Sequence, residues 1–281
     1  TLPVGTPIHG QLGSQLDVDR YRLHVDEPKV LTIAFDTLLD GASNGIFRVS
    51  LENAAGVEFV AHQLVWVDRV FMANLATAGD YYLVVRNVLG LAEAQPYRVS
   101  ASLQSGISGV ELEPNDVYPN ALRSGEVIRG QLASLQDRDL FTLYVAQAST
   151  LSIVFDAPPD GLSSHFYLSV LDSGGNLLAR RGPEGDIAFS VTTAEAGDYI
   201  VVVESDDVFF HSGDYALTVS SNPSTQLYES ESNDTDATAD TLLLGQQIRG
   251  QLAGTQDQDH FRISLASSGT MALEFLAPSD S

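Results

Sequence analysis

The sequence predicts an all-β chain built from tandem β-sandwich domains, and three observations support this prediction. One segment occurs three times at a constant offset of 120 residues, beginning at Gly10, Gly130 and Gly250. A period this long indicates repeated globular domains, since solenoid repeats run about 20–50 residues. The repeated segments alternate apolar and polar residues as half-buried strands do, and no stretch keeps a helical period.

The repeat divides the 281 residues into three copies. Copy 1 covers residues 1–105 and copy 2 covers residues 111–221, with a short link containing Ser and Gly between them. Copy 3 covers residues 229–281 and stops soon after the run that ends at Phe275. Because copies 1 and 2 both continue well beyond the corresponding run, we expect copy 3 to hold only the N-terminal half of a sandwich.

Copy 2 shows the strand pattern clearly. Phe141, Leu143 and Val145 alternate with polar or mixed residues, and residues 151–155 and 166–170 repeat that alternation. Turn-forming sequences such as DAPPDG at 156–161 separate the runs. Seven or eight such strands in a domain of about 100 residues are typical of a β-sandwich.

A second shared block lies in the later half of the first two copies. AGDYYLVV, from Ala78, returns as AGDYIVVV from Ala196. Tyr97 likewise returns as Tyr215 near the end of copy 2. These later strands extend the repeat over the whole of copies 1 and 2.

Composition excludes several classes of function. The chain has 14 basic and 37 acidic residues, a formal net charge of −23, which repels nucleic acid and anionic membrane surfaces. No apolar run approaches the roughly 20 residues of a membrane span, so we expect neither a nucleic-acid partner nor membrane insertion. The absence of cysteine excludes thiolate catalysis and Cys-based zinc sites.

Two acidic clusters recur at the start of each strand array. The leading block ELEPND at 111–116 returns as ESESND at 229–234. An Asp-x-Asp pair follows it at Asp137 and Asp139, and again at Asp257 and Asp259. Copy 1 has the pair, as Asp17 and Asp19, without a leading block, so we expect it to bind metal weakly or not at all.

The spacing of the pair indicates a cation site. Asp137 and Asp139 have the same parity as Phe141, so on one strand they would face the core side together. Two carboxylates there repel each other and lose solvation, and Ca²⁺, which takes six to eight oxygen ligands, relieves both penalties. The leading block could supply further oxygens if it folds back over the strand. Asx turns before a strand and a merely polar linker are the alternatives.

The combined pattern resembles the bacterial pre-peptidase C-terminal domain. The matching features are the leading ExEPND, I-x-G-x-L, D-x-D-x-F-x-L-x-V and a later GDYxxxV strand. The resemblance covers copy 2 throughout, copy 1 without its leading block, and the first half of copy 3, where Ser232 replaces Pro114. It implies a jelly-roll type of β-sandwich, found beside catalytic domains in secreted peptidases and other exported or surface proteins.

The related collagen-binding domains of bacterial collagenases bind calcium through the corresponding acidic segment. By this resemblance, the calcium ligands in copy 2 are Glu111, Glu113, Asn115, Asp116, Asp137 and Asp139. The corresponding ligands in copy 3 are Glu229, Glu231, Asn233, Asp234, Asp257 and Asp259.

We therefore expect non-catalytic, calcium-stabilised spacer or accessory domains of a secreted or surface bacterial protein, beside a catalytic or adhesive part of the same chain. One alternative is a module that anchors an enzyme to an extracellular protein such as collagen or to a polysaccharide, for which Tyr82 and Trp66 are weak candidate contacts. A second alternative is a hydrolase site in the divergent copy 1. The histidines do not recur between copies, and neither GxSxG nor HExxH occurs.

Overall fold

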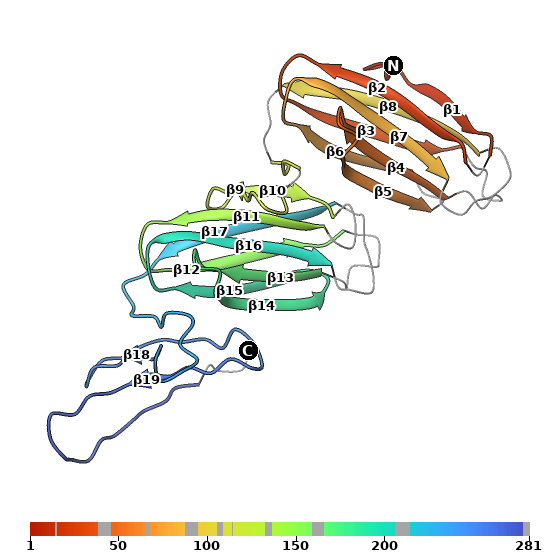
Figure 1. Ribbon diagram of the computed structural model, residues 1–281. Helices are drawn as coiled ribbons and strands as arrows, with labels where there is room; N and C mark the ends of the chain where they lie inside the picture. The colour runs from red at the N-terminus through yellow and green to blue at the C-terminus, as the bar shows by residue number, and fades with distance from the viewer. Residues whose placement is uncertain are drawn as a thin grey trace.

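The computed structural model confirms the all-β prediction (Figure 1). Every regular element that it describes is a strand, and it shows no helix long and apolar enough to cross a membrane. The structure describes residues 1–14, 16–38, 46–65, 68–87, 95–105, 109–113, 115–132, 137–158, 166–205 and 214–277.

Copy 1 contains two four-stranded sheets, with strand orders β1-β8-β3-β6 and β2-β7-β4-β5. All the pairings within them are antiparallel. The strands are β1 (Ile8–Leu12), β2 (Val18–Val25), β3 (Lys29–Thr37), β4 (Ile46–Asn53), β5 (Glu58–Val65), β6 (Arg69–Leu75), β7 (Gly79–Asn87) and β8 (Gln95–Ser105).

Copy 2 repeats this arrangement with sheets β10-β17-β12-β15 and β14-β13-β16-β11-β9. The added strand β9 (Asn120–Ala121) pairs in parallel with β11. The other strands are β10 (Val127–Gly130), β11 (Arg138–Val145), β12 (Ser149–Asp156), β13 (Phe166–Leu171), β14 (Leu177–Glu184), β15 (Ile187–Thr193), β16 (Gly197–Ser205) and β17 (Tyr215–Pro223).

The strand order is that of a jelly roll. Apart from the added β9, consecutive strands in the first half of each copy alternate between the two sheets, and β1 neighbours β8 as β10 neighbours β17. Eight strands in two facing sheets form the double Greek key of this fold. The jelly-roll arrangement that the family resemblance implies is therefore confirmed.

Each sandwich encloses its own apolar core. The core of copy 2 includes Phe141, Leu143, Val145, Phe155 and Tyr215, none more than 3% exposed. The equivalent core of copy 1 is centred on Phe35, Phe47 and Tyr97, whose rings lie 5.2–5.7 Å apart. The alternation of buried and exposed residues along β11 follows the period of two predicted from the sequence.

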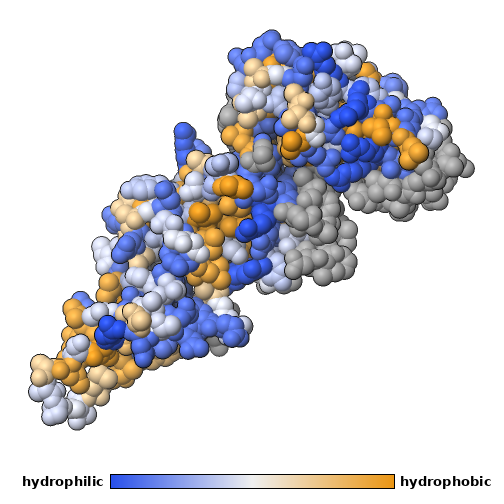
Figure 2. Space-filling view, in the orientation of Figure 1, coloured by the Kyte–Doolittle hydropathy of each residue, from blue (hydrophilic) through white to orange (hydrophobic). Residues whose placement is uncertain are grey.

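Copy 3 differs sharply from copy 2. Its described residues form only the short strands β18 (Asp240–Thr241) and β19 (Phe261–Arg262), which pair in parallel. Leu273 and Phe275 are 70% and 86% exposed, whereas Ile153 and Phe155 at the same repeat positions are at most 1% exposed. The apolar surface of copy 3 is visible at one end of Figure 2. The boundaries 1–105, 111–221 and 229–281 stay predictions.

Candidate metal centre

The leading acidic segment of copy 2 folds back beside the first strand of its sandwich. Val110 forms a parallel bridge with Arg129 of β10, and the amide of Glu111 donates to the Arg129 carbonyl at 2.9 Å. The Arg129 amide donates in turn to the Gly109 carbonyl at 3.0 Å. This pairing brings the Glu111 side chain over the end of β10, where Glu111 Oε1 accepts from the Gln131 amide at 2.7 Å.

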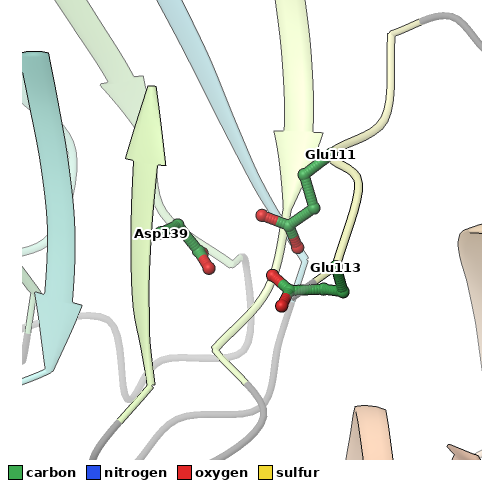
Figure 3. Close-up of side chains that lie close together, drawn as sticks. All are labelled: Glu111, Glu113 and Asp139. Carbon is green, nitrogen blue, oxygen red and sulfur yellow. The ribbon is translucent and has the colours of Figure 1, made fainter. Parts of the chain in front are cut away.

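Asp139 reaches the same place from β11. It is fully buried and lies on the same face of the strand as Phe141, Leu143 and Val145, as its parity predicts. One oxygen from each of Glu111, Glu113 and Asp139 lies within 4.8 Å of the other two. Figure 3 shows the three carboxylates pointing toward one another from the segment and the strand.

Asn115 completes this group. Its side chain is 0% exposed, and its Nδ2 donates to Glu111 Oε2 at 3.4 Å. Its amide oxygen is buried and has no donor. Asn115 therefore adds one neutral amide oxygen beside the three carboxylates.

Copy 3 builds the same cluster from the equivalent residues. Glu229, Glu231 and Asp259 place one oxygen each within 4.8 Å of one another. The Glu229 amide donates to the Arg249 carbonyl at 3.0 Å, and Asn233 Nδ2 donates to Glu229 Oε2 at 3.4 Å. The two clusters therefore have the same construction, although copy 3 lacks the buried core of copy 2.

When their carboxyls are ionised, the two clusters leave the same oxygens without hydrogen-bond donors. Buried polar atoms nearly always have a partner, because an unsatisfied one loses its hydration without compensation. An identical set of unsatisfied oxygens in two copies indicates a ligand set rather than a local packing fault. These oxygens are Glu113 Oε1, Asn115 Oδ1 and Asp139 Oδ1 in copy 2, and Glu231 Oε1, Asn233 Oδ1 and Asp259 Oδ1 in copy 3.

The carboxyl groups are held in a site that disfavours their charged forms. Burial raises the pKa of Glu111 well above its usual range, and the neighbouring Glu113 adds to that shift. Burial and then Asp139 raise the pKa of Glu113 to about 10, and burial followed by Glu111 raises that of Asp139. The shifts are smaller in the less buried cluster of copy 3, where burial is again the main cause. There the pKa of Glu229 is raised to about 8 and that of Glu231 to about 7.

Such a site fits a hard divalent cation. Its donors are carboxylate and amide oxygens, with neither His nor Cys in either cluster. Oxygen-only sites suit Ca²⁺, Mg²⁺ or Mn²⁺, and a cation would provide the positive charge that the buried carboxylates lack.

Comparisons with known proteins found structural similarity only. No family model matches the chain, and no curated protein matches it. Among solved structures, the pre-peptidase C-terminal domain of a collagenase from Bacillus anthracis is 21% identical, with a TM-score of 0.29. The match covers 39% of this chain and 99% of that one.

Two tandem carbohydrate-binding structures also match. The tandem CBM51 modules of a family 98 glycoside hydrolase from Streptococcus pneumoniae are 7% identical with a TM-score of 0.28, over 76% of this chain and 83% of that chain. The CBM22 tandem of Paenibacillus barcinonensis Xyn10C is 7% identical with a TM-score of 0.26, over 76% and 86%. A pre-peptidase C-terminal domain is thus among the structures that this chain resembles, as the sequence predicted. Similarity at these TM-scores assigns neither a ligand nor an activity.

The remaining predicted ligands lie beside the clusters. Asp137 is 9% exposed, just before β11, and its charge contributes to raising the pKa of all three clustered carboxyls. Asp257 accepts from the Ala253 amide. Asp116 accepts a hydrogen bond from the backbone amide of Arg138, the first residue of β11, at 3.1 Å. Asp234 accepts the equivalent bond from the amide of Gln258 at 3.3 Å. Pro114 lies outside the described residues.

Tyr215 is a site residue that the sequence did not identify as one. Its hydroxyl donates to Asp139 Oδ2 at 2.5 Å and lies 3.2 Å from Glu111 Oε2. A Cβ added at Gly130 would overlap both the Tyr215 hydroxyl and the Glu111 carboxylate, which explains a glycine at this repeat position. The return of Tyr97 as Tyr215 was the available signal, but only the folded sandwich shows what the hydroxyl reaches.

Copy 1 keeps the hydrogen bonds of the Asp-x-Asp pair but has no leading acidic block beside it. Asp19 accepts from the Tyr97 hydroxyl at 2.5 Å, and Asp17 accepts from the Gly13 amide at 2.7 Å. Without the leading block, these two carboxylates have no glutamate partners among the described residues of copy 1. The expectation that copy 1 binds metal weakly or not at all stays a prediction.

Of the two weak candidates for ligand contact, Tyr82 and Trp66, the structure describes only Tyr82. Tyr82, on β7, is half-buried, and the Arg20 guanidinium lies 5.7 Å from the centre of its ring. Its ring therefore already packs against a neighbour on the outer face of the sheet. Trp66 lies outside the described residues.

Proposed function

We propose that this chain is a set of non-catalytic β-sandwich modules, and that copies 2 and 3 each bind one Ca²⁺. They serve as spacer or accessory domains of a secreted or surface bacterial protein, beside a catalytic or adhesive part of the same chain. The observation that carries the proposal is the recurrence of one oxygen-only cluster, with the same unsatisfied oxygens, in two copies.

Calcium fits the donor set better than the other hard cations. It accepts irregular sets of six to eight oxygens, including two oxygens of one carboxylate, whereas Mg²⁺ demands a near-ideal octahedron and retains several waters. The residues that would hold it are Glu111, Glu113, Asn115 and Asp139, supported by Asp137 and Asp116, and the equivalent residues of copy 3. A bound cation would supply charge neutralisation. The protein's own contribution is to hold the linking segment against the first strand of the sandwich.

The surroundings of His24 in copy 1 do not suit a catalytic histidine. A hydrolytic histidine must have one ring nitrogen free to take a proton from a nucleophile. His24 is exposed, with Nδ1 2.7 Å from Asp80 Oδ1 and Nε2 3.3 Å from Asp26 Oδ1. Both nitrogens therefore face carboxylates, as expected for a surface ion-pair group.

A thermal melt in excess Ca²⁺ and then in EDTA tests the proposal. A site bound at 100 times its Kd adds about 2.7 kcal/mol, which raises the Tm of a domain of about 100 residues by roughly 10–20 °C. The shift should disappear for copy 2 in Asp137→Ala/Asp139→Ala. The matched control is Asp156→Ala/Asp198→Ala, which removes the same charge from exposed positions. Equal melting in Ca²⁺ and EDTA would contradict the proposal.

Anchoring to collagen or a polysaccharide is a separate possibility and requires its own assay. We would measure retention of the chain on insoluble collagen and on polysaccharide, with Tyr82→Ala and Trp66→Ala as variants. Retention that either variant abolishes would replace the spacer role with an anchoring role.

A further inference from the structure

The metal-binding segment of copy 2 also contacts copy 1. Asn74, on the edge strand β6, is 5% exposed, and its side chain reaches out of its own sandwich. Its Nδ2 donates to the carbonyl of Glu111 at 2.8 Å and also to the carbonyl of Val110. The backbone of the first glutamate in the cluster is therefore held by a side chain from the preceding sandwich.

The joint between copies 2 and 3 uses the same edge. Thr192 of β15 pairs with Thr150 as Asn74 of β6 pairs with Val30, so the two residues occupy one position in the fold. The Thr192 amide donates to Gln251 Oε1 at 3.1 Å, and Gln251 Nε2 donates to the Leu178 carbonyl at 3.1 Å.

This second joint also leads directly to a metal cluster. The backbone amide of the same Gln251 donates to the carboxylate of Glu229. Tyr228, the residue before Glu229, shares a hydrogen bond of 3.1 Å between its hydroxyl and Thr150 Oγ1. In the first joint, edge strand β6 holds the carbonyls of the first cluster glutamate and of the residue before it. In the second joint, edge strand β15 holds Gln251, whose backbone amide donates to the first cluster glutamate.

The hydrogen bond from Asn74 to the Glu111 carbonyl is buried, and the other polar contacts of the two joints are partly buried. The Asn74 side chain can donate only where the Val110 and Glu111 carbonyls are docked, and removing one partner leaves buried groups unsatisfied. If the segment lies against β6 with Glu111 out of place, the bonds from Asn74 are lost. Docking of the segment and assembly of the cluster are therefore expected to favour each other.

We infer that β6 and β15 are docking edges for the metal clusters of the following copies, β6 through the backbone of Glu111 and β15 through Gln251, so that each preceding sandwich raises the calcium affinity of the next site. Asn74 and Gln251 are the positioning residues. The inference rests on the proposed calcium function and deepens it. Because coupling between two equilibria is reciprocal, calcium binding must tighten the same joints.

Isothermal titration with CaCl2 on the whole chain tests the inference one site at a time. Glu231→Gln/Asp259→Asn silences copy 3, and in that background Asn74→Ala should raise the Kd of copy 2 about 5-fold to 50-fold. Asn74→Asp, which keeps the shape and loses the donor, should do the same. Gln104→Ala removes an exposed amide from the same sandwich and should leave the Kd unchanged.

The reverse background tests the second joint. With copy 2 silenced by Glu113→Gln/Asp139→Asn, Gln251→Ala should raise the Kd of copy 3, and Asn74→Ala should not. Unchanged affinity in Asn74→Ala, Asn74→Asp and Gln251→Ala would overturn the inference while the calcium function stands. Absence of binding by the unmutated chain would overturn the calcium function itself, and the inference with it.

Distances across the first joint give a readout independent of affinity. The chain has no cysteine, so spin labels can be placed at Asp26→Cys and Asp198→Cys, both exposed, without background. Calcium should narrow the distance distribution in the otherwise unmutated chain and fail to do so with Asn74→Ala. Equal widths with and without calcium would contradict the reciprocal tightening.

Discussion

The hydroxyl of Tyr215 donates to Asp139 Oδ2 at 2.5 Å, across the two sheets of the copy 2 sandwich. Tyr215 begins β17, in the sheet of β10 and β12, whereas Asp139 lies on β11 in the facing sheet. The bond fixes one carboxylate oxygen, and the other, Oδ1, has no donor. Tyr97 and Asp19 form the same bond in copy 1, so it is a feature of the fold that the proposed metal site of copy 2 also uses.

Tyr215→Phe should destabilise copy 2 and weaken its metal site. A hydrogen bond to a charged acceptor contributes about 1.5–3 kcal/mol, and its loss leaves a buried carboxylate oxygen unsatisfied. Urea unfolding in excess calcium should show that loss, and titration should show a several-fold weaker site. Tyr97→Phe is the control, because it should lower the stability of copy 1 without changing either calcium affinity. Equal calcium affinity in both variants would show that Tyr215 is structural only.

The strand that carries Asp139 could be predicted from sequence because its information is local. Alternation with a period of two decides which side chains share a face, so the parity of Asp139 with Phe141 was sufficient to place it inside. The leading block and that strand occur together in copies 2 and 3, and this recurrence linked the two, although they lie more than 20 residues apart.

The roles within the leading block could not be predicted in the same way. The segment has no regular period, so nothing in the sequence distinguishes Asn115, which turns inward, from Asp116, which caps the Arg138 amide. The contacts of Tyr215 and Asn74 depend on closure of the sandwich and on docking of neighbouring copies. Those relationships are set by tertiary packing and leave only a recurrent tyrosine in the sequence.

Gly130→Ala should disrupt the site through its volume alone. The added methyl group would overlap the Tyr215 hydroxyl and the Glu111 carboxylate, which cannot both move without losing their bonds. Overpacking of this kind costs about 1–3 kcal/mol, measured as a lower free energy of unfolding and a weaker copy 2 site. Gly197→Ala is the matched control, since no atom lies within 4 Å of its added carbon. Comparable losses in the two variants would contradict the steric explanation.

Phe155 and Phe275 should respond very differently to the same substitution. They occupy one repeat position, but Phe155 is 0% exposed in the copy 2 core and Phe275 is 86% exposed. Phe155→Ala should lower the free energy of unfolding of copy 2 by about 3–5 kcal/mol, whereas Phe275→Ala removes little buried surface and should cost less than about 0.5 kcal/mol. Denaturant unfolding of both variants gives the comparison. A large loss in Phe275→Ala would mean that this side chain is buried in solution.

Without metal, stability should fall as the pH rises. The pKa of Glu113 is raised to about 10, and those of Glu229 and Glu231 to about 8 and 7, in the folded chain. A raised pKa means that the folded state holds protons that the unfolded state has released, so the stabilisation is complete below about pH 4.5 and is lost through the folded pKa. Urea unfolding in EDTA between pH 5 and 9 should show this decline. A saturating excess of calcium should abolish it, and a flat profile in EDTA would contradict the raised values.

The same protons should be released when calcium binds. At pH 7, groups with pKa values of about 10 and 8 are mostly protonated, and a carboxyl must give up its proton to bind a cation. The heat of calcium binding should therefore differ among buffers with different enthalpies of ionisation, and the number of protons released should fall as the starting pH is raised. Silencing copy 3 with Glu231→Gln/Asp259→Asn should leave the larger part of the release, because Glu111, Glu113 and Asp139 are the more deeply buried set. Binding heats that are equal in all buffers would mean that the carboxyls are already ionised before calcium binds, which would contradict the raised pKa values.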